Sequence, residues 1–78
     1  MLDVRFEAIL RSVAELPDDL PITGEQNLRS ELGIDSLVLL DLIVNLEAEY
    51  GVELRDELSA DVGTVEDLWL EVSRAVTP

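Results

Sequence analysis

The sequence predicts an all-α domain: a small bundle of three main helices plus one short helix, with a long first loop. Apolar residues recur at helical spacing in three separate segments, and no segment shows the strict alternation of a strand. The chain has 78 residues, so we expect a single domain over residues 1–78. A core of this size supplies only about 3–5 kcal/mol of net stability, so the fold must be simple.

The first helix is predicted over residues 3–15. Its apolar face follows helical spacing and consists of Phe6, Ile9, Leu10, Val13 and Leu16. Asp3 and Glu7 suit the positive end of the helix dipole. Pro17 is expected to end the helix.

The long loop is "PDDLPITGEQNLRSELGID", residues 17–35. Loops of this length are uncommon inside compact domains and are often functional. We expect spaced apolar residues to hold it against the core, namely Leu20, Ile22, Leu28, Leu32 and Ile34. Within it, "NLRSEL" predicts a short helical turn capped by Asn27.

The second main helix is predicted to begin at Asp35 or Ser36, either of which is a suitable N-cap, and to run to Tyr50 ahead of Gly51. The predicted core stripe is Leu39, Leu42, Ile43, Leu46 and Tyr50. The other side carries Leu37, Leu40, Asp41, Val44, Asn45 and Ala48. The helix is therefore apolar almost all round near its start, which a surface helix does not need.

Two more helical segments complete the bundle. "RDELSADV" predicts one or two turns. The residues expected to face inward there are Leu54, Leu58 and Val62. The final helix is predicted over residues 64–76, where Thr64 and Asp67 resemble a capping box. Its apolar face consists of Val65, Leu68, Trp69, Val72 and Val76.

The charge balance limits the partners. The chain has 18 acidic and 5 basic residues, a net charge of −13. This field repels nucleic acid and anionic membranes, so we expect neither as a partner. It favours transient association with basic protein surfaces, although composition alone is also compatible with plain solubility.

Self-repulsion among these charges should destabilise the folded chain at low salt. We therefore predict that added salt or divalent cations raise the melting temperature, because they screen the repulsion. Thermal unfolding followed at several salt concentrations checks this. A melting temperature that stays flat from low to high salt would contradict it.

The residue types argue against catalysis and against a metal site. The chain has no histidine or cysteine, and all five basic residues are arginine. Ser36 therefore has no evident neighbouring base, and we expect no enzymatic activity. No segment matches the calcium-loop spacing. No apolar run is long enough for a membrane span, and "MLDVRFEAIL" lacks the features of a secretory signal, so we expect a cytoplasmic protein.

Ser36 has two interpretations. It can be a helix N-cap, which sequence physics alone favours. Alternatively, it can accept a phosphodiester, because free N–H groups and the dipole at a helix start stabilise a phosphate. Leu37, Leu40 and Val44 would then form an apolar docking strip for another protein.

A family resemblance bears on this choice. "LGIDSL" at residues 32–37 closely resembles the phosphopantetheine attachment motif of acyl carrier proteins. The likeness continues through "LLDLIVNLEAEYGVEL", which resembles the second helix of that family and the turn after it. "TVEDL" at residues 64–68 resembles the start of its last helix. Length, acidity and helix order agree across essentially the whole chain.

The resemblance implies a prosthetic arm. A phosphopantetheinyl transferase would attach 4′-phosphopantetheine from coenzyme A to Ser36, and the arm's thiol would carry an acyl or aminoacyl group as a thioester. The missing cysteine and base fit this, because the arm supplies the sulfur and partner enzymes do the chemistry. The implied partners are an acyl- or aminoacyl-loading enzyme and ketosynthase- or acyltransferase-type enzymes. We expect the carrier itself to be a monomer.

Partner recognition is expected along the second helix, at Asp35, Leu37, Val38, Leu40, Asp41, Val44, Glu47 and Ala48. Members from fatty acid synthesis commonly have acidic residues where this chain has Val38 and Ala48. We therefore hypothesise a specialised polyketide- or nonribosomal-peptide-type pathway. Ile34 stands where peptidyl carriers usually have a second glycine, which favours acyl cargo and leaves aminoacyl cargo open.

A function of a different class is also compatible with the sequence. An acidic helical adaptor would bind a partner through Leu37, Leu40 and Val44 without any prosthetic group. Ser36 would then be a cap only.

Overall fold

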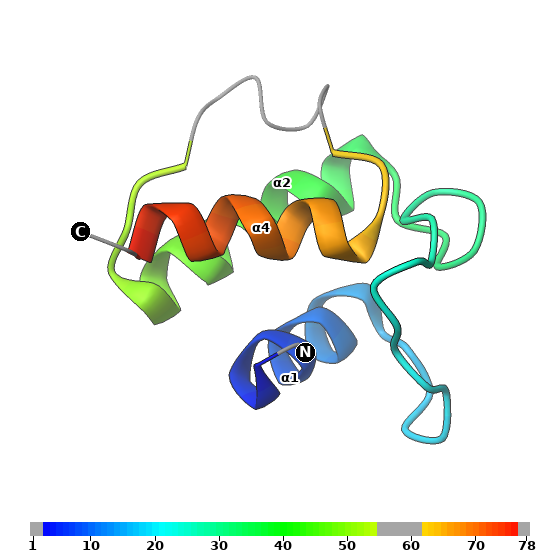
Figure 1. Cartoon of the computed structure of the whole chain (residues 1–78). Coiled ribbons are helices and arrows are strands. Elements are labelled where there is room, and N and C mark those ends of the chain that lie inside the picture. Colours follow the sequence, from blue (N-terminus) through cyan, green and yellow to red (C-terminus); the bar gives the residue numbers. More distant parts are fainter. Residues whose placement is uncertain (1–2, 55–61, 77–78) are drawn as a thin grey trace.

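The computed structural model describes residues 3–54 and 62–76 and shows three helices around one core (Figure 1). The helices are α1 (Val4–Ala14), α2 (Ser36–Tyr50) and α4 (Val65–Val76). In the described ranges the only strand-like feature is an isolated bridge. The all-α class and the three main helices are confirmed. The predicted short helix, with Leu58, lies outside the described residues.

Local caps set the ends of α1. The side chain of Asp3 accepts a hydrogen bond from the backbone N–H of Arg5, at 2.8 Å. Glu15 adopts the left-handed conformation (φ 54°), and its N–H donates to the carbonyl of Arg11. The helix thus ends at a left-handed cap. The predicted end at residue 15 is correct to within one residue, and the helix stops at this cap two positions before Pro17.

The predicted capping box at the start of α4 is confirmed. The hydroxyl of Thr64 accepts from the backbone N–H of Asp67 at 3.2 Å. The Asp67 carboxylate accepts in return from the N–H groups of Gly63 and Thr64, both at 3.2 Å. These bonds favour the charged carboxylate, so the N–H of Gly63 and then that of Thr64 lower the pKa of Asp67.

This lowered pKa predicts a contribution to acid stability. The stabilisation is present above the ordinary carboxyl pKa of about 3.9, and it is lost as the pH falls through the folded-state pKa. We expect wild type to lose more free energy of unfolding on acidification from about pH 5 to pH 2 than Asp67→Asn does. Urea unfolding at a series of pH values measures the difference.

Glu66→Gln is the matched control for that experiment. It removes the same charge from the exposed neighbouring residue, but it leaves the capping box intact. Its acid dependence should follow that of wild type. Equal behaviour of Asp67→Asn and Glu66→Gln would show that the cap contributes nothing to the pH dependence.

The long loop is held to the core, as predicted. Leu28, Leu32 and Ile34 are buried, while Leu20 and Ile22 pack half-buried against the same cluster. "NLRSEL" does form a turn, in which the Asn27 side chain accepts from the N–H groups of the residues two and three positions on, both at 2.9 Å.

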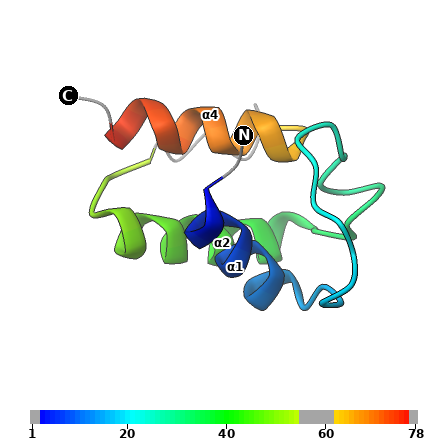
Figure 2. The same ribbon diagram turned by 60° about the horizontal axis from the view of Figure 1, so that its bottom comes forward.

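Backbone hydrogen bonds also join the loop to the start of α4. The donors and acceptors are Leu28 N to Gly63 O (2.9 Å), Val65 N to Gln26 O (3.0 Å) and Glu66 N to Gly24 O (2.9 Å). The starts of α2 and α4 therefore lie at one end of the molecule, beside the loop, as two views show (Figures 1 and 2).

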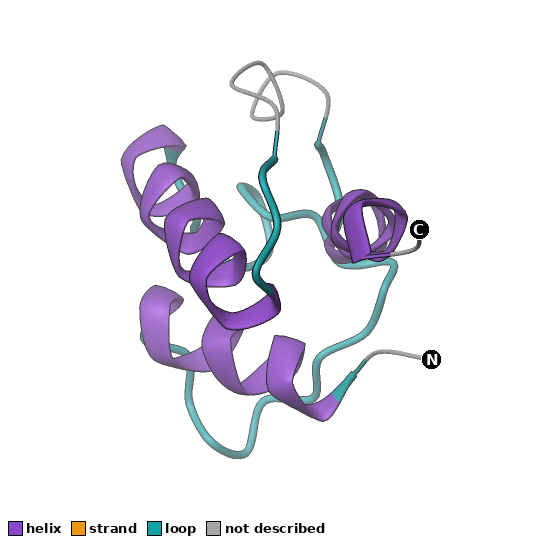
Figure 3. Cartoon of the chain, turned by 90° about the vertical axis from the view of Figure 1, so that its left-hand side faces the viewer, coloured by secondary structure: helices purple, strands orange, loops and turns teal. Residues whose placement is uncertain are grey.

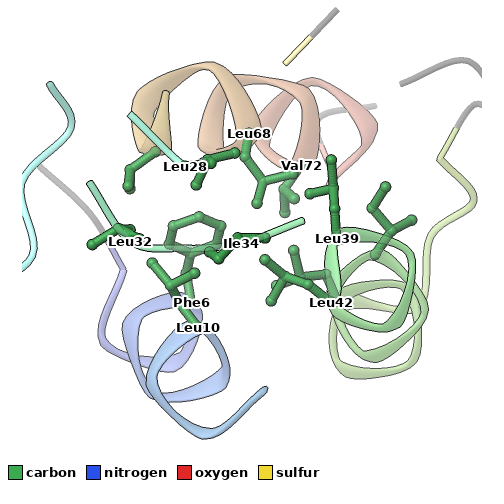
Figure 4. Close-up of a cluster of buried hydrophobic side chains, with 12 residues drawn as sticks. Phe6, Leu10, Leu28, Leu32, Ile34, Leu39, Leu42, Leu68 and Val72 are labelled. Atoms are coloured by element: carbon green, nitrogen blue, oxygen red, sulfur yellow. The ribbon is translucent and has the colours of Figure 1, made fainter. Parts of the chain in front are cut away.

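The helices and the loop enclose the interior of the molecule (Figure 3), and the core side chains point into it (Figure 4). Its buried residues are Phe6, Leu10, Leu28, Leu32, Ile34, Leu39, Leu42, Ile43, Leu46, Val65, Leu68 and Val72. The predicted stripe of α2 is confirmed except that Tyr50 is only half-buried. Val76, predicted on the apolar face of α4, is 50% exposed because it is the last residue of that helix.

The aromatic side chain of Trp69 in α4 contacts one aromatic ring from each of the other two helices. The ring of Trp69 lies 5.2 Å from that of Phe6 and 6.3 Å from that of Tyr50, in tilted and edge-on arrangements. Such geometries add to the stabilisation from burial. The guanidinium of Arg5 lies 4.7 Å from the centre of the Tyr50 ring, an attractive cation–π contact. This cluster ties α1, α2 and α4 together.

Candidate functional site

The start of α2 is capped by Asp35. Its carboxylate accepts a hydrogen bond from the backbone N–H of Val38 at 2.9 Å, and its own backbone is extended, as in an N-cap. Ser36 is the first helical residue. The interpretation of Ser36 as the N-cap is therefore wrong. A charged carboxylate one residue earlier performs that role and leaves the serine hydroxyl outside the cap.

The loop places Ser36 on the surface. Ile34, two residues earlier, is buried with 1% exposure, and its N–H donates to the carbonyl of Leu28 at 2.8 Å. Gly33 allows the turn before it by adopting a positive φ of 68°. With Ile34 anchored in the core, Asp35 and Ser36 are exposed at the helix start.

A cation lies beside the Ser36 hydroxyl. Nη2 of Arg29 donates a hydrogen bond to Oγ of Ser36 at 3.0 Å. Arg29 sits in the turn of the long loop, seven residues before the serine. The periodicity of the sequence carried no signal for this contact, because it depends on how the loop folds back toward α2.

An exposed apolar strip leads away from Ser36 along α2. It consists of Leu37, Leu40 and Val44, whose exposed fractions are 77%, 49% and 61%. Residues three and four apart share one helix face, so the three side chains form a continuous surface. Asp41 and Ala48 are also exposed. The sequence placed these five residues away from the core stripe, and the structure agrees.

Comparison with known proteins identifies the family. Residues 5–69 match the family described as the phosphopantetheine attachment site. An acyl carrier protein of Rubrobacter xylanophilus is 36% identical over 67 residues, which is 78% of this chain and 83% of the relative. The chain belongs to the acyl carrier protein family. The matched family is defined by the site at which phosphopantetheine is attached.

Other relatives agree with this assignment. Acyl carrier protein 1 of Casuarina glauca, a chloroplast protein, is 37% identical over 60 residues, 77% of this chain and 43% of the relative. The chain thus spans less than half the length of that relative. The solved structure of Rv0033 from Mycobacterium tuberculosis, a candidate acyl carrier protein, superposes with a TM-score of 0.81 at 30% identity, covering 90% of this chain and 92% of that one.

The start of α2 fits the phosphate of the arm. Ser36 is exposed and its oxygen is not used by the cap, while Arg29 contributes a cation next to that oxygen. A guanidinium and the N-terminus of a helix are both suited to a phosphate. These residues of the carrier would hold the phosphodiester end of the prosthetic group.

Two of the residues predicted for partner recognition are half-buried, whereas the other six are exposed. Val38 packs half-buried against the core. The Glu47 carboxylate accepts from the backbone N–H of Leu54 at 2.7 Å, where it holds the turn after α2. The sequence analysis did not predict the hydrogen bond between Glu47 and Leu54, because Leu54 lies beyond the end of α2. The recognition role of both residues stays a prediction.

Within residues 3–54 and 62–76, no three histidine, cysteine or acidic side chains gather as a candidate metal site. No helix in those ranges has the length and apolar character needed to cross a membrane.

Proposed function

We propose that residues 1–78 act as one carrier domain that bears its phosphopantetheine arm on Ser36. The observation that carries this proposal is the exposed Ser36 hydroxyl at the start of α2, left outside the cap by Asp35. The arm supplies a thiol, on which the acyl group is held as a thioester. The carrier supplies an accessible attachment oxygen and a surface that other enzymes recognise.

That surface is proposed to be the exposed side of α2. Leu37, Leu40 and Val44 offer apolar contacts, and the exposed carboxylates of Asp35 and Asp41 attract basic partner surfaces. The net charge of −13 favours fast, salt-sensitive encounter. The partners in this proposal are the transferase, a loading enzyme and ketosynthase- or acyltransferase-type enzymes, acting on a monomeric carrier in the cytoplasm.

One loading experiment tests the attachment. The protein is incubated with coenzyme A and a promiscuous phosphopantetheinyl transferase, and its intact mass is measured. We expect one phosphopantetheine adduct, located on Ser36 by mass spectrometry of the proteolytic peptide. No adduct with an active transferase would instead favour the acidic adaptor that binds through Leu37, Leu40 and Val44 alone.

The proposed pathway is a specialised one of the polyketide or nonribosomal-peptide type. Its support is the apolar character of α2 at Val38 and Ala48, where relatives from fatty acid synthesis commonly carry acidic residues. Of the two, Ala48 is the stronger indication because it is exposed, whereas Val38 packs against the core. An uncharged residue at an exposed recognition site weakens binding to basic surfaces selected for a carboxylate.

A comparison of loading enzymes tests the pathway. Housekeeping fatty-acid enzymes should load the carrier poorly compared with pathway enzymes, and Ala48→Glu should improve loading by the housekeeping set. A panel of acyl and aminoacyl donors, scored by intact mass, measures both effects and identifies the cargo class. Comparable loading of wild type by the two enzyme sets would overturn the specialised assignment.

A further inference from the structure

Arg29 is held in place by the turn that precedes α2. Its backbone N–H donates to the side chain of Asn27 at 2.9 Å, and its carbonyl accepts from Gly33 at 3.2 Å. Local hydrogen bonds thus hold both the backbone N–H and the backbone carbonyl of Arg29. The exposed side chain reaches Ser36, where Nη2 lies 3.0 Å from Oγ. No other side-chain hydrogen bond of Arg29 is present among the described residues.

Among the described residues, no carboxylate forms an ion pair with Arg29. In the part of the chain that the structure describes, Arg5 pairs with Glu49 at 3.4 Å and Arg74 with Glu71 at 3.2 Å. Arg29 forms no such ion pair in those ranges, although the chain carries 18 acidic residues. Its guanidinium binds a neutral hydroxyl instead. A cation that faces a neutral acceptor, in so acidic a chain, has charge available for an anion.

Esterification of Ser36 would supply that anion. The serine oxygen would then bridge to phosphorus, and the negative charge would lie on the two non-bridging oxygens. These are stronger acceptors for a guanidinium than a neutral hydroxyl oxygen. The phosphate would also add a negative charge beside Asp35, which raises the repulsion unless a cation offsets it.

The geometry points to Arg29 as the residue that binds the phosphodiester of the arm and holds the arm's root against the start of α2. This inference rests on the proposed attachment to Ser36. Arg29 is a positioning residue here: it orients the arm and takes no part in thioester chemistry. With the phosphodiester held there, the directions in which the rest of the arm could leave Ser36 would be fewer.

The test uses the intact holo-protein and three variants. Wild type, Arg29→Gln, Arg29→Lys and Arg74→Gln are loaded to completion from coenzyme A, with loading confirmed by intact mass. Arg74→Gln is the matched control because it removes the same charge from an exposed arginine at the far end of α4. Phosphorus NMR of the phosphodiester and the melting temperatures of apo and holo forms are recorded at low and high salt.

We expect the phosphodiester resonance of wild type and Arg74→Gln to move with added salt as the ion pair is screened. In Arg29→Gln at low salt, the resonance should already lie where the wild-type resonance lies at high salt. Loading should also lower the melting temperature of Arg29→Gln more than that of wild type or Arg74→Gln at low salt. Arg29→Lys keeps the positive charge but lacks the planar guanidinium with its several N–H donors. Its resonance and melting behaviour should therefore lie between those of wild type and those of Arg29→Gln.

The outcomes separate this inference from the proposal on which it rests. No adduct on wild type would overturn both, and would be seen at the mass step. Complete loading with the same resonance and melting behaviour in Arg29→Gln and Arg74→Gln would overturn the role of Arg29 alone. If Arg29→Gln is not loaded by the transferase, Arg29→Lys takes its place. The same resonance and melting behaviour in Arg29→Lys and Arg74→Gln would then overturn the role of Arg29.

Discussion

Replacing Ser36 with alanine is expected to abolish phosphopantetheine attachment completely while leaving the fold intact. The hydroxyl oxygen is the proposed attachment atom, so its removal leaves nothing to esterify. The helix should survive because Asp35, not Ser36, caps α2, and alanine is the best helix former. Intact mass after incubation with coenzyme A and transferase measures the adduct, and circular dichroism checks the helix content.

Ser30→Ala provides the matched control for this experiment. Ser30 is also exposed and lies in the turn before α2, so the two variants remove the same group from nearby places. Ser30→Ala should accept one full adduct, as wild type does. An adduct of equal yield on Ser36→Ala would show that another residue carries the arm.

Replacing Leu42 with alanine is expected to remove most of the stability of the protein and bring it close to its unfolding midpoint at room temperature. Leu42 is fully buried in the middle of α2. Truncation of a buried leucine to alanine typically costs about 2–5 kcal/mol. A core of this size provides only about 3–5 kcal/mol of net stability, so the loss approaches the whole margin. Urea unfolding followed by circular dichroism measures the free energy of unfolding.

Leu37→Ala is the control for the core variant. It makes the same substitution in the same helix, but Leu37 is 77% exposed. The change in free energy of unfolding should stay within about 0.5 kcal/mol. A loss below about 1 kcal/mol for Leu42→Ala would mean that the surrounding side chains close the space it leaves. The core would then be adaptable enough to part around a cargo.

Much of the fold was predictable because its signals are local. Helical spacing identified the buried stripe at Leu39, Leu42, Ile43 and Leu46, and the box of Thr64 and Asp67 marked the start of α4. The motif at residues 32–37 pointed to Ser36 as the attachment residue, and that role stays a prediction. In each case the residues that interact lie within a few positions of one another, or the signal is a repeat along the chain. Such patterns are readable without a three-dimensional structure.

The site was less predictable where two neighbouring residues are both suited to the same structural role. Asp35 and Ser36 are both good N-caps, and sequence rules allow either. The choice depends on which residue has extended backbone, and the anchoring of Ile34 in the core sets that. The end of α1 also had two possible causes. Pro17 alone could stop the helix, but the backbone already turns into the left-handed conformation at Glu15.

The sequence by itself determined the helical class, the acidic surface and the attachment motif, because these follow from composition, periodicity and a contiguous run of residues. Only the tertiary structure decided which side chains meet across the loops. It brought Arg29 to Ser36, turned Glu47 toward Leu54 and packed Val38 against the core. Such contacts depend on the path of a long loop and on which face of a helix is covered. The apolar pattern leaves both undetermined when a helix is apolar on nearly every side.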